Sequence, residues 1–179
     1  MKIVGIVGVL YLPKSEGRVW RNLRCAYEEE FPGCEFVVEK MLYLPWQKTK
    51  MRAFAQRILE RHDHGQEIIL LGYSLGGVIA CAIAERFAKS RVRAVVTIVA
   101  PHRVGLFYRA LGTKRHLLRM PVFTFTGLFD VFVPRFLTMY PGNIHADLRS
   151  DHLLFFILSQ EPARAVARGT RAGLAPRGL

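Results

Sequence analysis

The chain has 179 residues, of which 51% are apolar, and it carries a formal net charge of +12. This composition excludes an intrinsically disordered chain, and the length allows one domain with a single sizeable core. No apolar run reaches the roughly 18 residues that a membrane-spanning helix needs.

Apolar runs alternate with amphipathic runs along the chain, which is typical of a parallel sheet covered by helices. In the first half of the chain they predict strands over 2–10, 35–41 and 67–72 and helices over 18–30, 49–63 and 75–89. In the second half they predict strands over 93–99, 121–126 and 142–147 and helices over 106–111 and 151–159.

The last residues, 160–179, are rich in Arg, Ala and Gly, and we expect a frayed, flexible tail there because chain ends are commonly disordered. Its arginines offer the alternative of contact with an anionic surface. The predicted fold is therefore a three-layer α/β domain with a mostly parallel sheet over 1–159, followed by a basic tail over 160–179.

The first twelve residues have one Lys and a short apolar stretch, as a signal peptide does, but no small-residue cleavage site follows. Removing them would also delete a predicted central strand. The three cysteines are an odd number without metal-site spacing, and Cys81 lies in an apolar helical run. These features predict a cytoplasmic protein.

The net charge of +12 favours acidic partners, such as phospholipid headgroups, anionic polymers or nucleic acid. The alternative is a set of solvated basic faces without a partner. No nucleic-acid-reading motif accompanies the charge, so we do not predict specific nucleic-acid binding. The sequence leaves the oligomeric state open.

The motif GYSLG over 72–76 carries the predicted chemistry. It matches G-x-S-x-G, in which a sharp strand-to-helix turn holds a serine in a strained conformation and exposes its hydroxyl to a base. An apolar strand precedes Ser74 and an apolar helix follows it, which is the setting that this motif requires. The alternative is a glycine-rich turn with an incidental serine.

Two later segments complete a resemblance to the α/β-hydrolase superfamily, in particular to its minimal, lidless bacterial lipases. TGLFDVFVP over 126–134 resembles the family's acid loop, and SDHLL over 150–154 resembles its histidine loop. The resemblance implies a triad of Ser74 as nucleophile, His152 as its base and Asp130 as the acid that orients the imidazole.

Other acids and histidines compete for these roles. Asp130 could be a simple turn residue, Asp147 and Asp151 are alternative acids, and Asp151 could instead cap the last helix. His145 is the alternative base, although a packed histidine is expected on a strand. The histidines of His62-Asp63-His64 could bind a metal, but we expect them to lie at a helix end near the C-terminal dipole.

The oxyanion hole departs from the family's pattern. One donor is expected to be the backbone N–H of Leu75, and the second a backbone N–H of Tyr11 or Leu12 after the first strand. Many relatives have His-Gly at that second place, whereas this chain has LYLP over 10–13. Pro13 cannot donate.

Aromatic and aliphatic residues flank the predicted site and could line an apolar acyl pocket: Tyr73, Leu106, Phe107, Phe129, Phe132, Phe136, Leu137 and Tyr140. The alternative is ordinary core and surface packing. Nothing in the sequence indicates a metal, nucleotide or redox cofactor.

The predicted function is hydrolysis of a carboxylic ester, of a small molecule or a lipid, through an acyl-enzyme. A thioesterase, acyltransferase or amidase would use the same triad. A different alternative is a catalytically inactive hydrolase fold that serves as a binding or scaffold protein.

Overall fold

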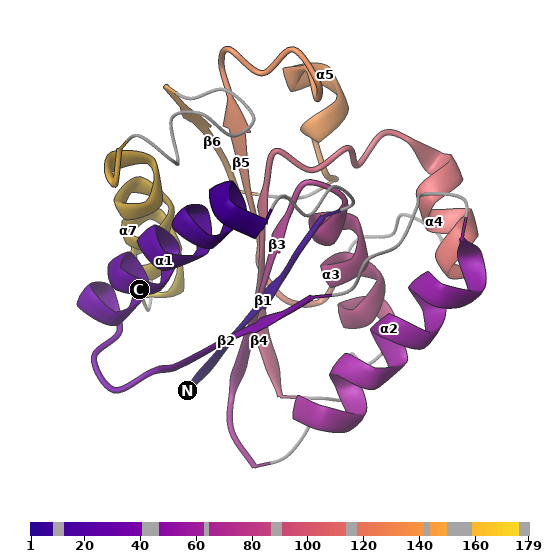
Figure 1. The fold of residues 1–179 in the computed structure, drawn as a ribbon, viewed down its shortest axis with the longest axis horizontal. Coiled ribbons are helices and arrows are strands. Elements are labelled where there is room, and N and C mark those ends of the chain that lie inside the picture. The colour runs from indigo at the N-terminus through magenta and orange to yellow at the C-terminus, as the bar shows by residue number, and fades with distance from the viewer. Residues whose placement is uncertain are drawn as a thin grey trace.

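Six strands form one sheet at the centre of the computed structural model, which describes residues 1–8, 13–40, 47–62, 65–86, 91–113, 118–141, 144–149 and 159–175 (Figure 1). The sheet order is β2-β1-β3-β4-β5-β6, and every neighbouring pair is parallel. The strands are β1 Lys2–Ile6, β2 Glu35–Glu39, β3 Ile68–Tyr73, β4 Val92–Ile98, β5 Val122–Gly127 and β6 Ile144–Leu148. The predicted α/β fold with a mostly parallel sheet is confirmed.

Helices cover both faces of the sheet and make the three layers (Figure 1). One face carries α1 Pro13–Glu30 and α7 Glu161–Leu174, and the other carries α2 Lys48–His62, α3 Leu75–Arg86 and α4 Gly105–Leu111. A separate apolar core lies under each helical layer, so the inner strands are buried on both faces. This double burial explains why β3 reads as an unbroken apolar run.

The elements predicted within the described residues are present, with shifted ends. The strand predicted over 2–10 is regular only to Ile6, and the helix predicted from 18 begins at Pro13, where a proline suits the first turn because its missing N–H has no intrahelical acceptor. The helix predicted over 151–159 falls almost entirely outside the described residues.

The prediction of a flexible tail from residue 160 is wrong. Residues Glu161–Leu174 form α7, which packs against α1 and β5. Ala163, Val166 and Ala167 are fully buried on its inner side. No apolar periodicity indicates this helix in the sequence, because its buried residues are mostly small. The domain therefore extends through residue 174.

Three arginines of α7 pair with acids of α1. Arg164 pairs with Glu29 at 3.3 Å, and Arg168 and Arg171 pair with Glu30 at 3.7 and 3.2 Å. These pairs attach α7 to the acidic C-terminal turn of α1. Contact of the tail with an anionic surface stays a prediction.

The sheet order reverses direction between β1 and β3. The chain after β1 enters α1 on one face, and the chain after β3 enters α3 on the other face. In open α/β sheets, ligands bind outside the carboxyl ends of the strands at such a switch point. Among the described helices, none combines the length and apolarity required to cross a bilayer.

Candidate active site

Ser74 lies at the switch point, on the turn between β3 and α3. Its φ of +53° is in the left-handed region that a residue with a side chain rarely adopts. Its N–H donates to the Ile98 carbonyl oxygen at 2.8 Å, and its own carbonyl accepts from Gly77 N–H at 2.9 Å. Ser74 is partly exposed although its neighbours on both sides are buried. The turn therefore has the geometry that the G-x-S-x-G motif predicts.

The glycines of the motif are required because backbone segments meet there. A Cβ at Gly72 would overlap the Gly76 carbonyl, and a Cβ at Gly76 would overlap the Ile6 carbonyl. Small residues thus let α3 begin directly against β1 and β3, as the motif requires.

The end of β1 touches the same turn. A Cβ on Gly8 would lie 2.9 Å from the Ser74 Cβ and 3.4 Å from the Leu75 backbone nitrogen. Leu75 is the first residue of α3, so its N–H has no acceptor within the helix and can serve a ligand. Tyr11 and Leu12, the predicted second oxyanion donors, follow this strand end but lie outside the described residues.

A second strained residue lies beside the first. Val99, directly after β4, has a φ of +46°, which is a genuine outlier for a β-branched residue. Ser74 and Val99 are the two non-glycine residues with positive φ in the described part of the chain. Such strain, at about 1–3 kcal/mol per residue, clusters at functional sites, and here both residues lie at the carboxyl edge of the sheet.

Asp130 follows β5 at the same edge and is buried. Its Oδ1 accepts the backbone N–H groups of Phe132 at 2.9 Å and Val133 at 2.8 Å. These bonds form a tight turn and fix the carboxylate, so the turn role and the predicted acid role are compatible. His152, its predicted partner, lies outside the described residues, as does Asp151.

His145 and Asp147 pair with each other on β6. His145 Nε2 lies 3.0 Å from Asp147 Oδ1 and 3.4 Å from the Thr126 hydroxyl, and Arg135 holds the other carboxylate oxygen at 3.1 Å. These contacts hold the imidazole within β6, as expected for a packed histidine on a strand.

A buried hydrogen-bond network links α4 to β4 and β5 through His102, and no sequence pattern indicates it. His102 is fully buried, with Nδ1 2.8 Å from the Tyr108 hydroxyl and Nε2 3.0 Å from the Thr97 hydroxyl, which in turn reaches Thr124. In sequence, His102 follows a strand as a lone histidine, so only its position in the fold reveals these contacts.

The predicted acyl-pocket residues lie in different environments. Tyr73 is buried in the core under α1 and α7, whereas Phe107 packs against the core under α2 and α3, so these two lie on opposite faces of the sheet. Phe129 and Phe132 are exposed, and so are Leu106 and Phe136. Tyr140 is buried. A pocket shared by the exposed residues stays a prediction.

The predicted helix-end histidine has a carboxylate partner. His62, the last residue of α2, places Nε2 2.7 Å from Glu39 Oε1, and Arg61 donates to both oxygens of the same carboxylate at 2.9 and 3.0 Å. Burial alone would raise the pKa of Glu39, but the bonds from His62 and Arg61 outweigh it and hold the pKa below its ordinary value. His62 therefore ties α2 to β2. Asp63 and His64 lie outside the described residues.

Comparisons with known proteins agree with this architecture. The sequence model of the family described as "alpha/beta hydrolase fold" matches residues 29–176. A search of curated proteins returns no significant match to the sequence.

Solved structures with the same fold cover nearly the whole chain. The pyrethroid hydrolase PytH superposes with a TM-score of 0.71 at 15% identity, covering 98% of this chain and 99% of its own. Est1E from Butyrivibrio proteoclasticus gives 0.71 at 14% identity, covering 96% and 88%. The RedJ thioesterase of the prodiginine pathway in Streptomyces coelicolor gives 0.63 at 14% identity, covering 96% and 89%.

Proposed function

Because this chain belongs to the alpha/beta hydrolase fold family, we propose that it is a serine hydrolase that cleaves carboxylic esters through an acyl-enzyme on Ser74. His152 is the proposed base, and Asp130 orients its imidazole. The observation that carries the proposal is the strained, partly exposed Ser74 at the start of α3, at the switch point of the sheet.

In the first half-reaction, the Ser74 oxygen attacks the ester carbonyl carbon while His152 takes the hydroxyl proton. The tetrahedral oxyanion accepts hydrogen bonds from the Leu75 N–H and from a second backbone N–H in the loop after β1. As the bond to the leaving alcohol breaks, the imidazolium returns the proton to the alcohol oxygen.

In the second half-reaction, water attacks the acyl carbon and His152 takes the water proton. The bond to Ser74 breaks, the serine oxygen regains a proton, and a carboxylic acid is released. The sum is one ester and one water converted to one acid and one alcohol.

A fluorophosphonate probe tests the nucleophile directly, because it phosphonylates an activated serine. We expect wild-type protein to be labelled and Ser74→Ala to stay unlabelled. Likewise, wild-type protein should hydrolyse nitrophenyl esters and Ser74→Ala should not. The matched control is Ser159→Ala, on the segment before α7. Folded wild-type protein that takes no label would instead favour the scaffold alternative.

A thioesterase is the second candidate, because the RedJ thioesterase shares this fold. Matched ester, thioester and amide substrates with one acyl group separate the possibilities by their kcat/KM values. A preference for the thioester would assign a thioesterase, and acyl transfer to an added alcohol in place of water would assign an acyltransferase. Ser74 would remain the nucleophile in both cases.

A further inference from the structure

The loop after β5 carries an exposed apolar surface. Eight large apolar side chains are exposed among the residues that the structure describes, and six of them lie within 128–139. We call these six the apolar rim: Leu128, Phe129, Val131, Phe132, Phe136 and Met139. Val131 and Phe132 are 82% and 79% exposed. Such a concentration of exposed apolar side chains in one short segment is typical of an interaction site.

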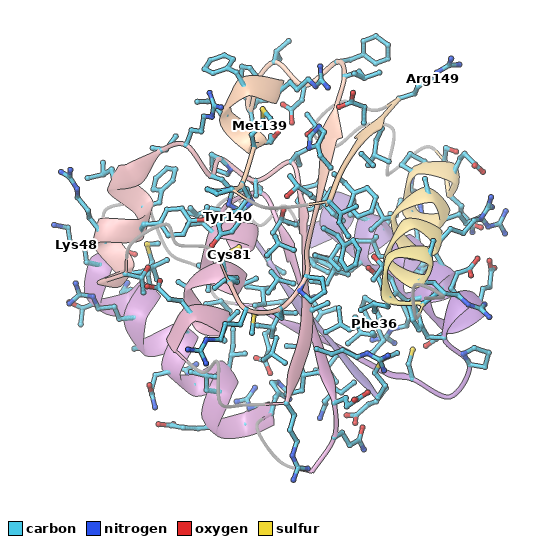
Figure 2. All side chains as sticks on the ribbon, turned by 180° about the vertical axis from the view of Figure 1, so that it is seen from behind. Phe36, Lys48, Cys81, Met139, Tyr140 and Arg149 are labelled. Carbon is cyan, nitrogen blue, oxygen red and sulfur yellow. The ribbon has the colours of Figure 1, made fainter. Side chains whose placement is uncertain are left out.

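Basic side chains border the rim. The Arg103 guanidinium contacts the Met139 sulfur at 3.9 Å, and Arg135 lies on the short helix α5, Arg135–Thr138, within the rim segment. Arg149 is exposed after β6, and Figure 2 shows it at the same end of the molecule as Met139.

Acidic groups do little to offset these cations. Asp130 and Asp147 are the only acids in the sequence from 128 to 149. Asp130 is buried and bound by backbone N–H groups, and Asp147 is paired with Arg135 and His145. The border of the rim therefore suits a partner that is apolar inside and negatively charged at its surface.

We infer that the apolar rim docks on an anionic phospholipid surface, with Val131 and Phe132 inserted among the acyl chains and Arg103 and Arg149 at the headgroups. Partial insertion of apolar side chains together with basic residues at the headgroup level is how peripheral proteins bind anionic membranes. Docking between two copies through this rim is disfavoured because each copy carries a net charge of +12 and would bring its arginines against those of the other.

The surface lies beside the proposed catalytic acid but does not depend on catalysis. Asp130 separates Phe129 from Val131 in the rim segment. Docking here would therefore hold the carboxyl edge of the sheet, with Ser74, toward the lipid. The binding can be measured on Ser74→Ala protein, so a failure of binding and a failure of hydrolysis are separate results.

Vesicle flotation of Ser74→Ala protein tests the inference. We expect the protein to float with vesicles of phosphatidylcholine and phosphatidylserine, to float less with phosphatidylcholine alone, and to be released by salt. Adding Val131→Ser and Phe132→Ser should weaken partitioning at least about tenfold, because each removes an inserted apolar side chain. Arg149→Ala should weaken it about fivefold.

Ile144→Ser is the matched control. Ile144 is also an exposed apolar residue, but it begins β6 beside Phe123, away from the rim. It should float as the parent does, and thermal unfolding should show that all variants are folded. Absence of flotation, or equal flotation of the rim variant, would overturn the inference. So would a rim-dependent dimer in light scattering without vesicle binding.

Discussion

The amino edge of the sheet, where the parallel strands begin, and the carboxyl edge, where they end, differ in which residues adopt positive φ. At the amino edge, Gly33 and Gly65 adopt φ of +76° and +81° just before β2 and β3, where glycine does so without steric cost. At the carboxyl edge, Ser74 and Val99 adopt φ of +53° and +46° despite their side chains. The turns at the amino edge therefore reach positive φ without backbone strain. At the carboxyl edge, Ser74 and Val99 reach it with strain.

Charged groups at the two edges differ in how deeply their carboxylates are buried. The amino edge has ion pairs whose carboxylates are exposed, Lys2 with Glu35 at 3.0 Å and Arg93 with Glu67 at 2.9 Å. Exposed pairs of this kind contribute little to stability. At the carboxyl end of β2, by contrast, the Glu39 carboxylate is buried and bound by two partners. Loss of a buried partner is far more costly than loss of an exposed one.

The largest expected effect concerns the proposed base, His152. We expect His152→Ala to lower kcat on a nitrophenyl ester about 10⁴-fold or more, because Ser74 would lose its proton acceptor. His145→Ala should change kcat less than about tenfold, since that imidazole is held by Asp147 on β6. The reverse ranking would assign the base to His145 and contradict the placement of the site.

The next effect contrasts a buried carboxylate with an exposed one. Glu39→Gln should lower the free energy of unfolding by about 1–3 kcal/mol at neutral pH, because it weakens bonds from Arg61 and His62. Glu67→Gln should lower it by less than about 0.5 kcal/mol. Chemical denaturation measures both.

The sign of the pH dependence follows from the lowered pKa of Glu39. Its ionised form stabilises the fold fully at pH values above the unfolded-state value of 4.5, and this contribution disappears as the pH falls through the lower folded-state pKa. The gap between wild type and Glu39→Gln should therefore shrink on acidification below that value. A gap that stays constant would show that the carboxylate charge is not its source.

The smallest expected effect comes from placing glycine at a strained position and alanine at a glycine position. The free energy of unfolding of Ser74→Gly should be about 1 kcal/mol higher than that of Ser74→Ala, because only glycine adopts the positive φ without strain. Gly65→Ala should lose about 1 kcal/mol at the amino edge, where a Cβ has open space but the wrong φ. If Ser74→Gly and Ser74→Ala were equally stable, the strain assigned to this turn would be absent.

Local patterns were enough to predict all six strands and the turn that carries Ser74. Both depend on short-range features, because burial on two faces imposes apolar runs on β3 and close backbone approach imposes glycine at 72 and 76. The resemblance to the family's acid loop put Asp130 on a loop after a strand, where the structure places it.

Contacts between distant segments could not be predicted from local patterns. Small residues of α7 pack into the core although no apolar run marks that helix, and His102 meets Tyr108 and Thr97 in the interior. Phe132 is exposed although it lies in an apolar segment. A local pattern indicates which residues can be buried, whereas packing across the fold determines which of them are buried.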